Sequence, residues 1–227
     1  MKFRAVIFDN DNTVVDTEPL HLKARQAVLK RECGCDFTRE EYVQHWIARP
    51  ISVGMAHTFP KMPEVERQTI GRKILDELHA LEEEELKLVP GVLALIHILS
   101  YRYRLAIATA RPRESVEDGL RRAFGESYKN LFDVIVSGED VRRNKPAPDV
   151  FLHVAVRLLL LPDECVVVED SSVGVFATKA AGMYCIARAN EWIETSELVA
   201  AGADVILRDY ENFARLLTGN NEFFPLS

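Results

Sequence analysis

Short apolar runs that lead into polar residues recur along this chain, and they constrain its fold more than any other feature. Six such runs lie at residues 5–8, 105–108, 134–136, 165–168, 184–187 and 204–207, the last two being weaker. Each is too short for a helix, and most are rich in Val and Ile without alternating polar residues. Continuous apolar character is typical of strands that are buried on both faces.

Helical patterns lie between these runs, at residues 113–124, 148–161 and 172–181. Pro148 and Asp149 suit the start of the second of these helices, and Gly182 suits the end of the third. Strands that alternate with helices predict an α/β fold in which helices flank a parallel sheet. In such sheets ligands bind beyond the carboxyl ends of the strands, where this chain places its polar residues.

The stretch from residue 17 to about 87 breaks this alternation. It carries helical patterns at 19–31, 39–46 and 64–85 and no convincing strand. We therefore predict an α/β catalytic core formed by residues 1–16 and 88–227. Residues 17–87 would be inserted into that core as a helical cap domain.

Charge and composition exclude several classes of partner. Acidic residues outnumber basic ones by 35 to 28, which argues against nucleic acid as a partner. No apolar run approaches the ~20 residues of a membrane span. The four cysteines lack the spacing of a metal site and are expected to be reduced thiols. We expect a cytoplasmic protein, monomeric or weakly dimeric, with neither a nucleic-acid nor a membrane partner.

The end of the first predicted strand carries the most informative residues. Asp9 and Asp11 follow the run AVIF, and on an extended segment residues i and i+2 point to the same side. Glu169 and Asp170 end another run and add two more acids. Four carboxylates without a His or Cys partner favour a hard cation, so Mg²⁺ is the expected cofactor.

These residue types also suit phosphoryl transfer. Asp9 can attack phosphorus to form an aspartyl-phosphate, and Asp11 can protonate the leaving group and later deprotonate water. Thr109 can donate a hydrogen bond to phosphate from the end of its strand. Lys145 can supply a fixed positive charge, because the neighbouring prolines of its loop restrict the backbone.

Four segments together resemble the motifs of the haloacid dehalogenase-like hydrolase superfamily. They are FDNDNTVVD at 8–16, AIATARPRESVE at 106–117, NKPAPDVF at 144–151 and VVVEDSSVGVFATKAAGM at 166–183. The resemblance is to the helical-cap group, which contains phosphatases and β-phosphoglucomutase-like proteins. It implies a Rossmann-like core and a small phosphorylated metabolite as the substrate.

The resemblance also implies roles for individual residues. Asp9 matches the nucleophile and Asp11 the general acid/base, and the superfamily's dehalogenases lack this second aspartate. The residues that match phosphate-binding positions are Thr109, Ala110 and Lys145. Those that match metal-binding positions are Asp9, Asp11 through its backbone carbonyl, Asp170 and, as a further ligand, Glu169.

Asn12 departs from the motif, because the family usually has glycine there. Glycine permits a positive φ, and Asn is among the residues that tolerate it best after glycine. Catalysis is therefore expected to survive the change. In the cap, His21 and Arg49 are the candidates for substrate contacts.

The leading hypothesis is a Mg²⁺-dependent phosphatase that acts on a small phosphorylated metabolite through an aspartyl-phosphate. The alternative is a β-phosphoglucomutase-like phosphosugar mutase, which rests on Glu169-Asp170, His21 and Arg49. A non-catalytic phosphate-binding scaffold is a third reading, and only Asn12 favours it.

Overall fold

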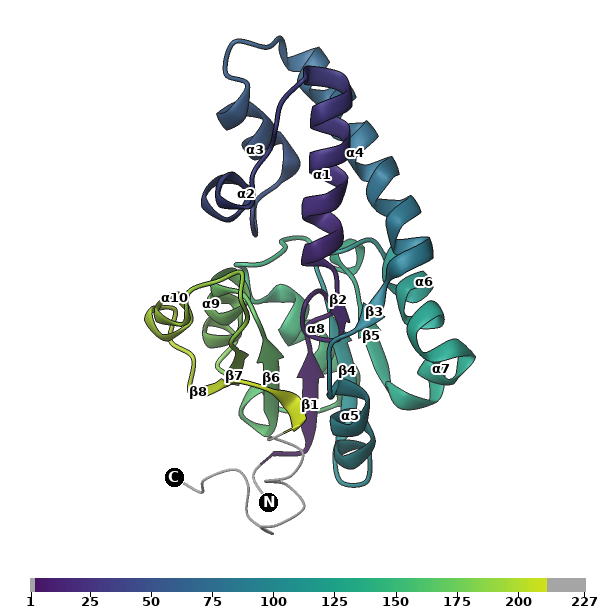
Figure 1. Ribbon diagram of the computed structural model, residues 1–227. Coiled ribbons are helices and arrows are strands. Elements are labelled where there is room, and N and C mark those ends of the chain that lie inside the picture. The colour runs from purple at the N-terminus through teal and green to yellow at the C-terminus, as the bar shows by residue number, and fades with distance from the viewer. Residues whose placement is uncertain (1–2, 212–227) are drawn as a thin grey trace. The chain divides into compact units, whose positions relative to one another are not determined.

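The computed structural model describes residues 3–211, and its main sheet has the strand order β5-β4-β1-β6-β7-β8 (Figure 1). All neighbouring strands of this sheet run parallel. The strands are β1 (Ala5–Phe8), β4 (Arg104–Ala108), β5 (Val134–Val136), β6 (Cys165–Glu169), β7 (Tyr184–Arg188) and β8 (Val205–Leu207). They coincide with the six apolar runs, so the predicted parallel α/β fold is confirmed.

The first strand, β1, lies in the middle of the sheet, between β4 and β6. All four of its residues are buried. Phe8 pairs in register with Ile107 of β4 and Val168 of β6. The residues that follow these three strands therefore meet at one edge of the sheet, the edge at which α/β proteins bind ligands.

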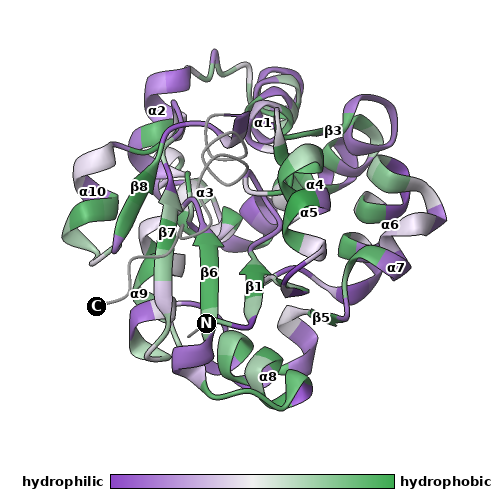
Figure 2. Ribbon diagram, turned by 90° about the horizontal axis from the view of Figure 1, so that it is seen from below, coloured by the Kyte–Doolittle hydropathy of each residue, from purple (hydrophilic) through white to green (hydrophobic). Residues whose placement is uncertain are grey.

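Helices cover both faces of this sheet. Figure 2 shows α8 and α9 on one side and α5 on the other. Ile7, Ala106 and Val167 of the sheet share one core cluster with Phe151 of α8 and Ala177 of α9. The helices of this unit are α5 (Val92–Ser100), α6 (Arg113–Phe124), α7 (Tyr128–Leu131), α8 (Asp149–Leu158), α9 (Ser172–Ala180) and α10 (Thr195–Ala200).

Residues 17–86 form a second compact unit, which is helical. In this insertion α1 and α4 pack through Leu20, Ala24 and Leu78, with Leu81 and Leu86 beside them. A capping box starts α2, where the Thr38 side chain accepts a hydrogen bond from the Glu41 N–H (3.1 Å). The four helices are α1 (Glu18–Cys33), α2 (Arg39–His45), α3 (Ile51–Thr58) and α4 (Glu64–Glu85).

Two short strands mark the points where the chain leaves the core and returns to it. They are β2 (Val15–Asp16) and β3 (Lys87–Leu88), which pair antiparallel with Val15 opposite Leu88. The core unit comprises the chain up to Asp16 and from Lys87 onward. No helix within residues 3–211 is long and apolar enough to cross a membrane.

Several element boundaries differ from the sequence prediction, and helix α3 was not predicted at all. Two of the boundary differences are informative. The helix expected over 148–161 ends at Leu158, because Leu159 adopts a left-handed backbone (φ 56°) and its N–H bonds back to α8. Glu169 is the last residue of β6 rather than the first residue after it. The direction of the Glu169 side chain is therefore set by the strand.

Candidate active site

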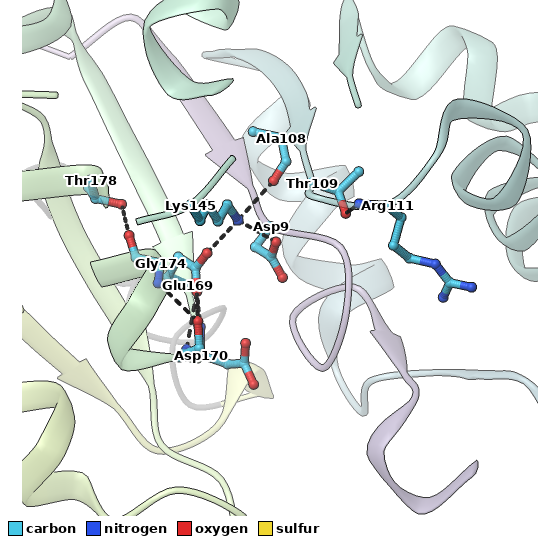
Figure 3. Close-up of polar contacts among 10 residues, drawn as sticks. Asp9, Ala108, Thr109, Arg111, Lys145, Glu169, Asp170, Gly174 and Thr178 are labelled. Carbon is cyan, nitrogen blue, oxygen red and sulfur yellow. Dashed lines mark hydrogen bonds and ion pairs between the residues drawn. The ribbon is translucent and has the colours of Figure 1, made fainter. Parts of the chain in front are cut away.

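The candidate site lies at the carboxyl edge of the sheet, where Lys145 reaches the ends of three strands. Its Nζ lies 2.6 Å from Asp9 Oδ1, 2.6 Å from Glu169 Oε1 and 3.1 Å from the Ala108 carbonyl oxygen (Figure 3). Nζ also lies 4.8 Å from the centre of the Phe151 ring. The Lys145 side chain is only 7% exposed, so its contacts with the two carboxylates are shielded from solvent.

Burial and charge shift the protonation of this group of residues. Burial raises the pKa of Asp9 to about 7; Lys145 opposes this rise, and the Glu169 and Asp11 carboxylates add to it. Burial alone would lower the pKa of Lys145, but Asp9 and Glu169 outweigh it and hold that pKa above its usual value. Lys145 is therefore a fixed cation, whereas Asp9 depends on nearby positive charge to stay ionised.

Glu169 has hydrogen-bond partners on both carboxylate oxygens. Oε1 accepts from Lys145, while Oε2 accepts from the Asp170 N–H (3.0 Å) and from the N–H and Oγ of Ser171 (3.1 and 3.0 Å). Ser171 also caps α9, since its Oγ accepts from the Gly174 N–H (3.1 Å). These contacts fix Glu169 as the residue that holds Lys145 in place.

Gly174 allows this arrangement because it lacks a side chain. A Cβ atom at this position would lie 1.9 Å from the Glu169 Cδ and Oε1 atoms. The first turn of α9 can therefore approach the carboxylate closely only with glycine here.

Asp170 completes a group of three buried acids. One oxygen from each of Asp9, Glu169 and Asp170 lies within 4.8 Å of the others. Asn190, which follows β7, donates from Nδ2 to Asp170 Oδ2 (3.0 Å) and accepts the Trp192 and Ile193 N–H groups on Oδ1. Asn190 thus orients Asp170, and hard oxygen donors of this kind suit a divalent cation such as Mg²⁺.

Asn12 adopts a left-handed backbone, with φ 51°, as glycine would permit at this position. Its carbonyl oxygen accepts a hydrogen bond from Arg188 Nη1 (2.8 Å), and the next carbonyl, that of Thr13, accepts one from the Tyr210 hydroxyl (3.0 Å). The Asn10 carbonyl accepts from the Val14 N–H (2.8 Å). Asparagine therefore adopts a positive φ of the kind that glycine would permit, and these hydrogen bonds, together with others inside the turn, hold the segment that carries Asp9 and Asp11.

Asp11 and Thr109 each have a partner in Arg111, which follows β4. Arg111 Nη1 lies 3.0 Å from Asp11 Oδ1, and the Arg111 N–H donates to Thr109 Oγ1 (3.1 Å). Ala110, which lies between Thr109 and Arg111 in the sequence, is exposed. Its carbonyl oxygen lies against Gly138, where a Cβ atom would be 2.2 Å away.

The two cap candidates lie in the helical unit. His21 is in the first turn of α1, where its Nδ1 lies 3.1 Å from Arg25 Nη1. Arg49 is exposed and donates from Nη1 to the Gln44 carbonyl (2.6 Å), at the end of α2.

Sequence reasoning missed the residues that support the site from elsewhere in the chain. Asn190 and Arg188 reach it from the end of β7, a strand that was predicted without any role at its end. Arg111 stands inside a recognised motif, but its contact with Asp11 depends on two loops that meet only in the fold. The Glu-Asp-Ser-x-x-Gly pattern could have identified Gly174, because glycine in the first turn of a helix implies a close approach.

The chain is similar to known proteins in sequence and in fold. A family model described as haloacid dehalogenase-like hydrolase matches residues 6–188. The phosphorylated carbohydrates phosphatase of Thermotoga maritima is 35% identical over 185 residues, which cover 79% of this chain and 82% of that protein.

Two solved structures share the fold over nearly their whole length. A putative β-phosphoglucomutase from Thermotoga maritima has a TM-score of 0.77 and 30% identity, covering 96% of this chain and all of that one. CbbY from Rhodobacter sphaeroides, in complex with phosphate, has a TM-score of 0.74 and 31% identity, covering 92% of this chain and 95% of that one. The predicted resemblance is thus confirmed: the chain belongs to the haloacid dehalogenase-like hydrolase family.

Proposed function

We propose that this protein is a Mg²⁺-dependent phosphatase that hydrolyses a small phosphorylated sugar through an aspartyl-phosphate on Asp9. The observation that carries the proposal is the buried Lys145, 2.6 Å from both Asp9 and Glu169 at the edge where Thr109 follows β4. A fixed cation beside an acid that is poised to act as a nucleophile suits the transfer of a dianionic phosphoryl group.

The donor set fits Mg²⁺, because three buried carboxylates lie together and no softer ligand accompanies them in the part of the chain that the structure describes. Asp9, Asp170 and the backbone carbonyl of Asp11 would hold the ion. Glu169 already uses both oxygens in hydrogen bonds, so we assign it to positioning Lys145 and, at most, to an indirect contact with the ion. When bound, Mg²⁺ supplies positive charge that offsets the charge of the phosphoryl group.

The chain's own residues divide the reaction into two steps. An Asp9 carboxylate oxygen attacks phosphorus, and the bond from phosphorus to the leaving oxygen breaks as Asp11 gives that oxygen a proton. Asp11 then takes a proton from water, whose oxygen attacks the aspartyl-phosphate and releases inorganic phosphate. Lys145 and the Thr109 hydroxyl stabilise the phosphoryl oxygens during both steps.

The sugar-phosphate class follows from the relatives. The 35% identical protein is named for phosphorylated carbohydrates, and the chain covers 82% of its length. Selectivity among such substrates is expected to depend on the helical cap, where His21 and Arg49 remain the candidate contacts.

The test is a panel of phosphorylated sugars assayed for phosphate release with Mg²⁺ and with a chelator. We expect metal-dependent release for at least one sugar phosphate and a loss of about 10³-fold or more in Asp9→Asn. Activity that Asp9→Asn leaves intact would refute the assignment.

A phosphosugar mutase is the second candidate, and the similarity to the putative β-phosphoglucomutase favours it. Glu169-Asp170, His21 and Arg49 are the residues on which it rests. Incubation with β-glucose 1-phosphate and a bisphosphate primer separates the two functions. Glucose 6-phosphate that forms faster than phosphate is released would support the mutase instead of the phosphatase.

A further inference from the structure

Arg25 is an arginine buried inside the helical cap, with only 4% of its surface exposed. It lies one turn after His21 on α1, so the two side chains occupy the same face of the helix. Arg25 Nη1 donates to the His21 carbonyl (2.7 Å) and contacts the His21 ring at Nδ1 (3.1 Å). Both contacts involve His21, one of the two cap residues that the sequence predicts to contact substrate.

Two aromatic rings, one within α2 and one at the end of that helix, hold the Arg25 guanidinium in place. Its central carbon lies 5.1 Å from the centre of the Tyr42 ring and 5.4 Å from that of Trp46. Trp46 is itself fixed, since its Nε1 donates to Thr58 Oγ1 (3.0 Å). A planar guanidinium between aromatic faces has few alternative orientations.

Two neighbours of Arg25 favour its charged form, although burial outweighs them. Burial lowers the pKa of Arg25, while Tyr42 and the Glu18 carboxylate oppose this shift. Glu18 accepts a hydrogen bond from the Tyr42 hydroxyl, which places this acid beside the same aromatic ring.

This arrangement is not the one that stability alone would favour. Arg25 Nε is buried and makes no hydrogen bond within the described residues 3–211. A buried charged group with an unsatisfied donor destabilises a fold relative to an apolar residue of similar volume. The presence of a buried arginine here is better explained by its effect on the neighbouring His21.

A guanidinium nitrogen can only donate, because it has no available lone pair. The His21 Nδ1 atom must therefore accept, which requires a ring that carries its single proton on Nε2. A ring protonated on both nitrogens would turn an N–H toward the guanidinium and break the contact. We propose that Arg25 is a positioning residue that holds His21 as the neutral Nε2–H tautomer, so that His21 acts on the substrate as a hydrogen-bond donor.

The role toward substrate rests on the proposed function, whereas the tautomer does not. A neutral N–H suits an uncharged or anionic oxygen acceptor, such as a sugar hydroxyl or an ester oxygen of a sugar phosphate. It does not suit a group that must itself donate to His21. The cap would in this way discriminate among substrates by the acceptor that they present to Nε2.

The first test reads the tautomer directly in the full-length wild-type protein. Nitrogen-15 spectra of histidine-labelled protein at neutral pH show which ring nitrogen carries the proton, and His21→Gln identifies the His21 signals by their loss. We expect the proton on Nε2. A ring with its proton on Nδ1, or one protonated on both nitrogens, would overturn the proposal without any variant that must fold.

The second test changes Arg25. Arg25→Met should release the tautomer, so that the Nδ1–H form becomes populated in the same spectra. Arg31→Met is the matched control, because Arg31 lies on the same helix but is exposed and paired with Glu77 (3.2 Å). An unchanged His21 tautomer in Arg25→Met would contradict the proposal.

The third test links the tautomer to turnover on a sugar phosphate that the wild-type protein hydrolyses. Arg25→Met and His21→Gln should each lower kcat/KM by roughly 10-fold, and the double variant should lose no more than His21→Gln alone. Additive losses would show that Arg25 acts independently of His21. If no phosphate ester is turned over, the proposed function fails while the tautomer result still stands.

Discussion

Lys145 in the α/β core and Arg25 in the helical cap are both buried cations, yet their neighbours differ in kind. Lys145 contacts two carboxylates and a carbonyl oxygen, all of which carry full or partial negative charge. Arg25 contacts two aromatic faces, a ring nitrogen and a carbonyl oxygen.

This difference separates a charge that compensates other charges from one that orients a neighbour. Removing Lys145 would leave Asp9 and Glu169 facing each other without a cation. Removing Arg25 would leave a space between two aromatic rings, which an apolar side chain can fill. The two positions should therefore respond differently to the same substitution.

Lys145→Met gives the largest expected effect. The substitution leaves two buried carboxylates unpaired, so we expect the free energy of unfolding to fall by about 3–5 kcal/mol. Phosphatase activity should fall by about 10²-fold or more, since the cation beside the phosphoryl group is lost. Urea unfolding and phosphate release with Mg²⁺ measure the two quantities.

The deficit in Lys145→Met should shrink as the pH falls, because protonation of Asp9, whose pKa is raised to about 7, removes its repulsion with Glu169. Unfolding curves at pH 5 and pH 8 test this dependence. A deficit that is equal at both pH values would mean that the lost charge is not the cause.

Mg²⁺ should stabilise the core in a pH-dependent way. Burial raises the pKa of Asp9 from 3.8 to about 7, so between these values the folded state binds more protons than the unfolded state. The contribution of Asp9 to stability then falls as the pH rises. Mg²⁺ would bind the ionised form of Asp9 and so offset the cost of ionising this buried acid. Asp9 is mainly protonated at pH 5 and mainly ionised at pH 8, so Mg²⁺ should raise Tm more at pH 8 than at pH 5.

When the Mg²⁺ concentration is about 100 times Kd, the ion should raise the free energy of unfolding by roughly 2.7 kcal/mol, which corresponds to about 5–10 °C in Tm. Thermal unfolding with Mg²⁺ or a chelator measures it, and Asp170→Asn should abolish most of the shift. A shift of the same size in Asp170→Asn would place the ion elsewhere.

Gly174→Ala tests the support beneath Lys145. The new Cβ atom would lie 1.9 Å from Glu169 Cδ, so the carboxylate must move away from its partners. We expect about 1–3 kcal/mol of destabilisation and a fall in kcat. In a Glu169→Ala background the same substitution should have little further effect, because the clash is gone. Equal losses in the two backgrounds would point to a cause in α9 itself.

Arg25→Met gives the smallest expected effect on stability, within about 1 kcal/mol of wild type, because the thioether side chain replaces a buried cation by an apolar group of similar length. Urea unfolding compares it with Lys145→Met under the same conditions. A loss as large as that of Lys145→Met would mean that the two buried cations do not differ as their neighbours suggest.

The strands and the edge of the sheet were predictable because apolar runs and strand-end polar residues are local features of the sequence. Asp9, Thr109 and Asp170 could be assigned to one edge from the alternation of strands and helices. Their catalytic roles stay predictions until Asp9→Asn and its companions are assayed.

The contacts of Arg188 with Asn12 and of Arg111 with Asp11 could not be predicted, since each joins segments that are distant in sequence. Arg188 and Asn12 are 176 residues apart, and nothing in either local pattern relates them. The end of α8 was missed for another reason: a leucine at φ 56° carries no glycine or asparagine to signal a left-handed backbone. Arg25 was missed because a basic residue in a helical pattern is usually on the solvated face.

The pairing of Val15 with Leu88 has a consequence for how such a chain can diversify. The polypeptide leaves the core and returns to it at adjacent positions of one two-stranded ribbon. The intervening segment is therefore an insertion whose ends are held together by the core. The entropy cost of closing a loop grows only slowly with its length. Insertions, deletions or exchange of a whole helix between these strands would therefore leave the parallel sheet and its catalytic edge free to form, and new substrate preferences could arise without redesigning the chemistry.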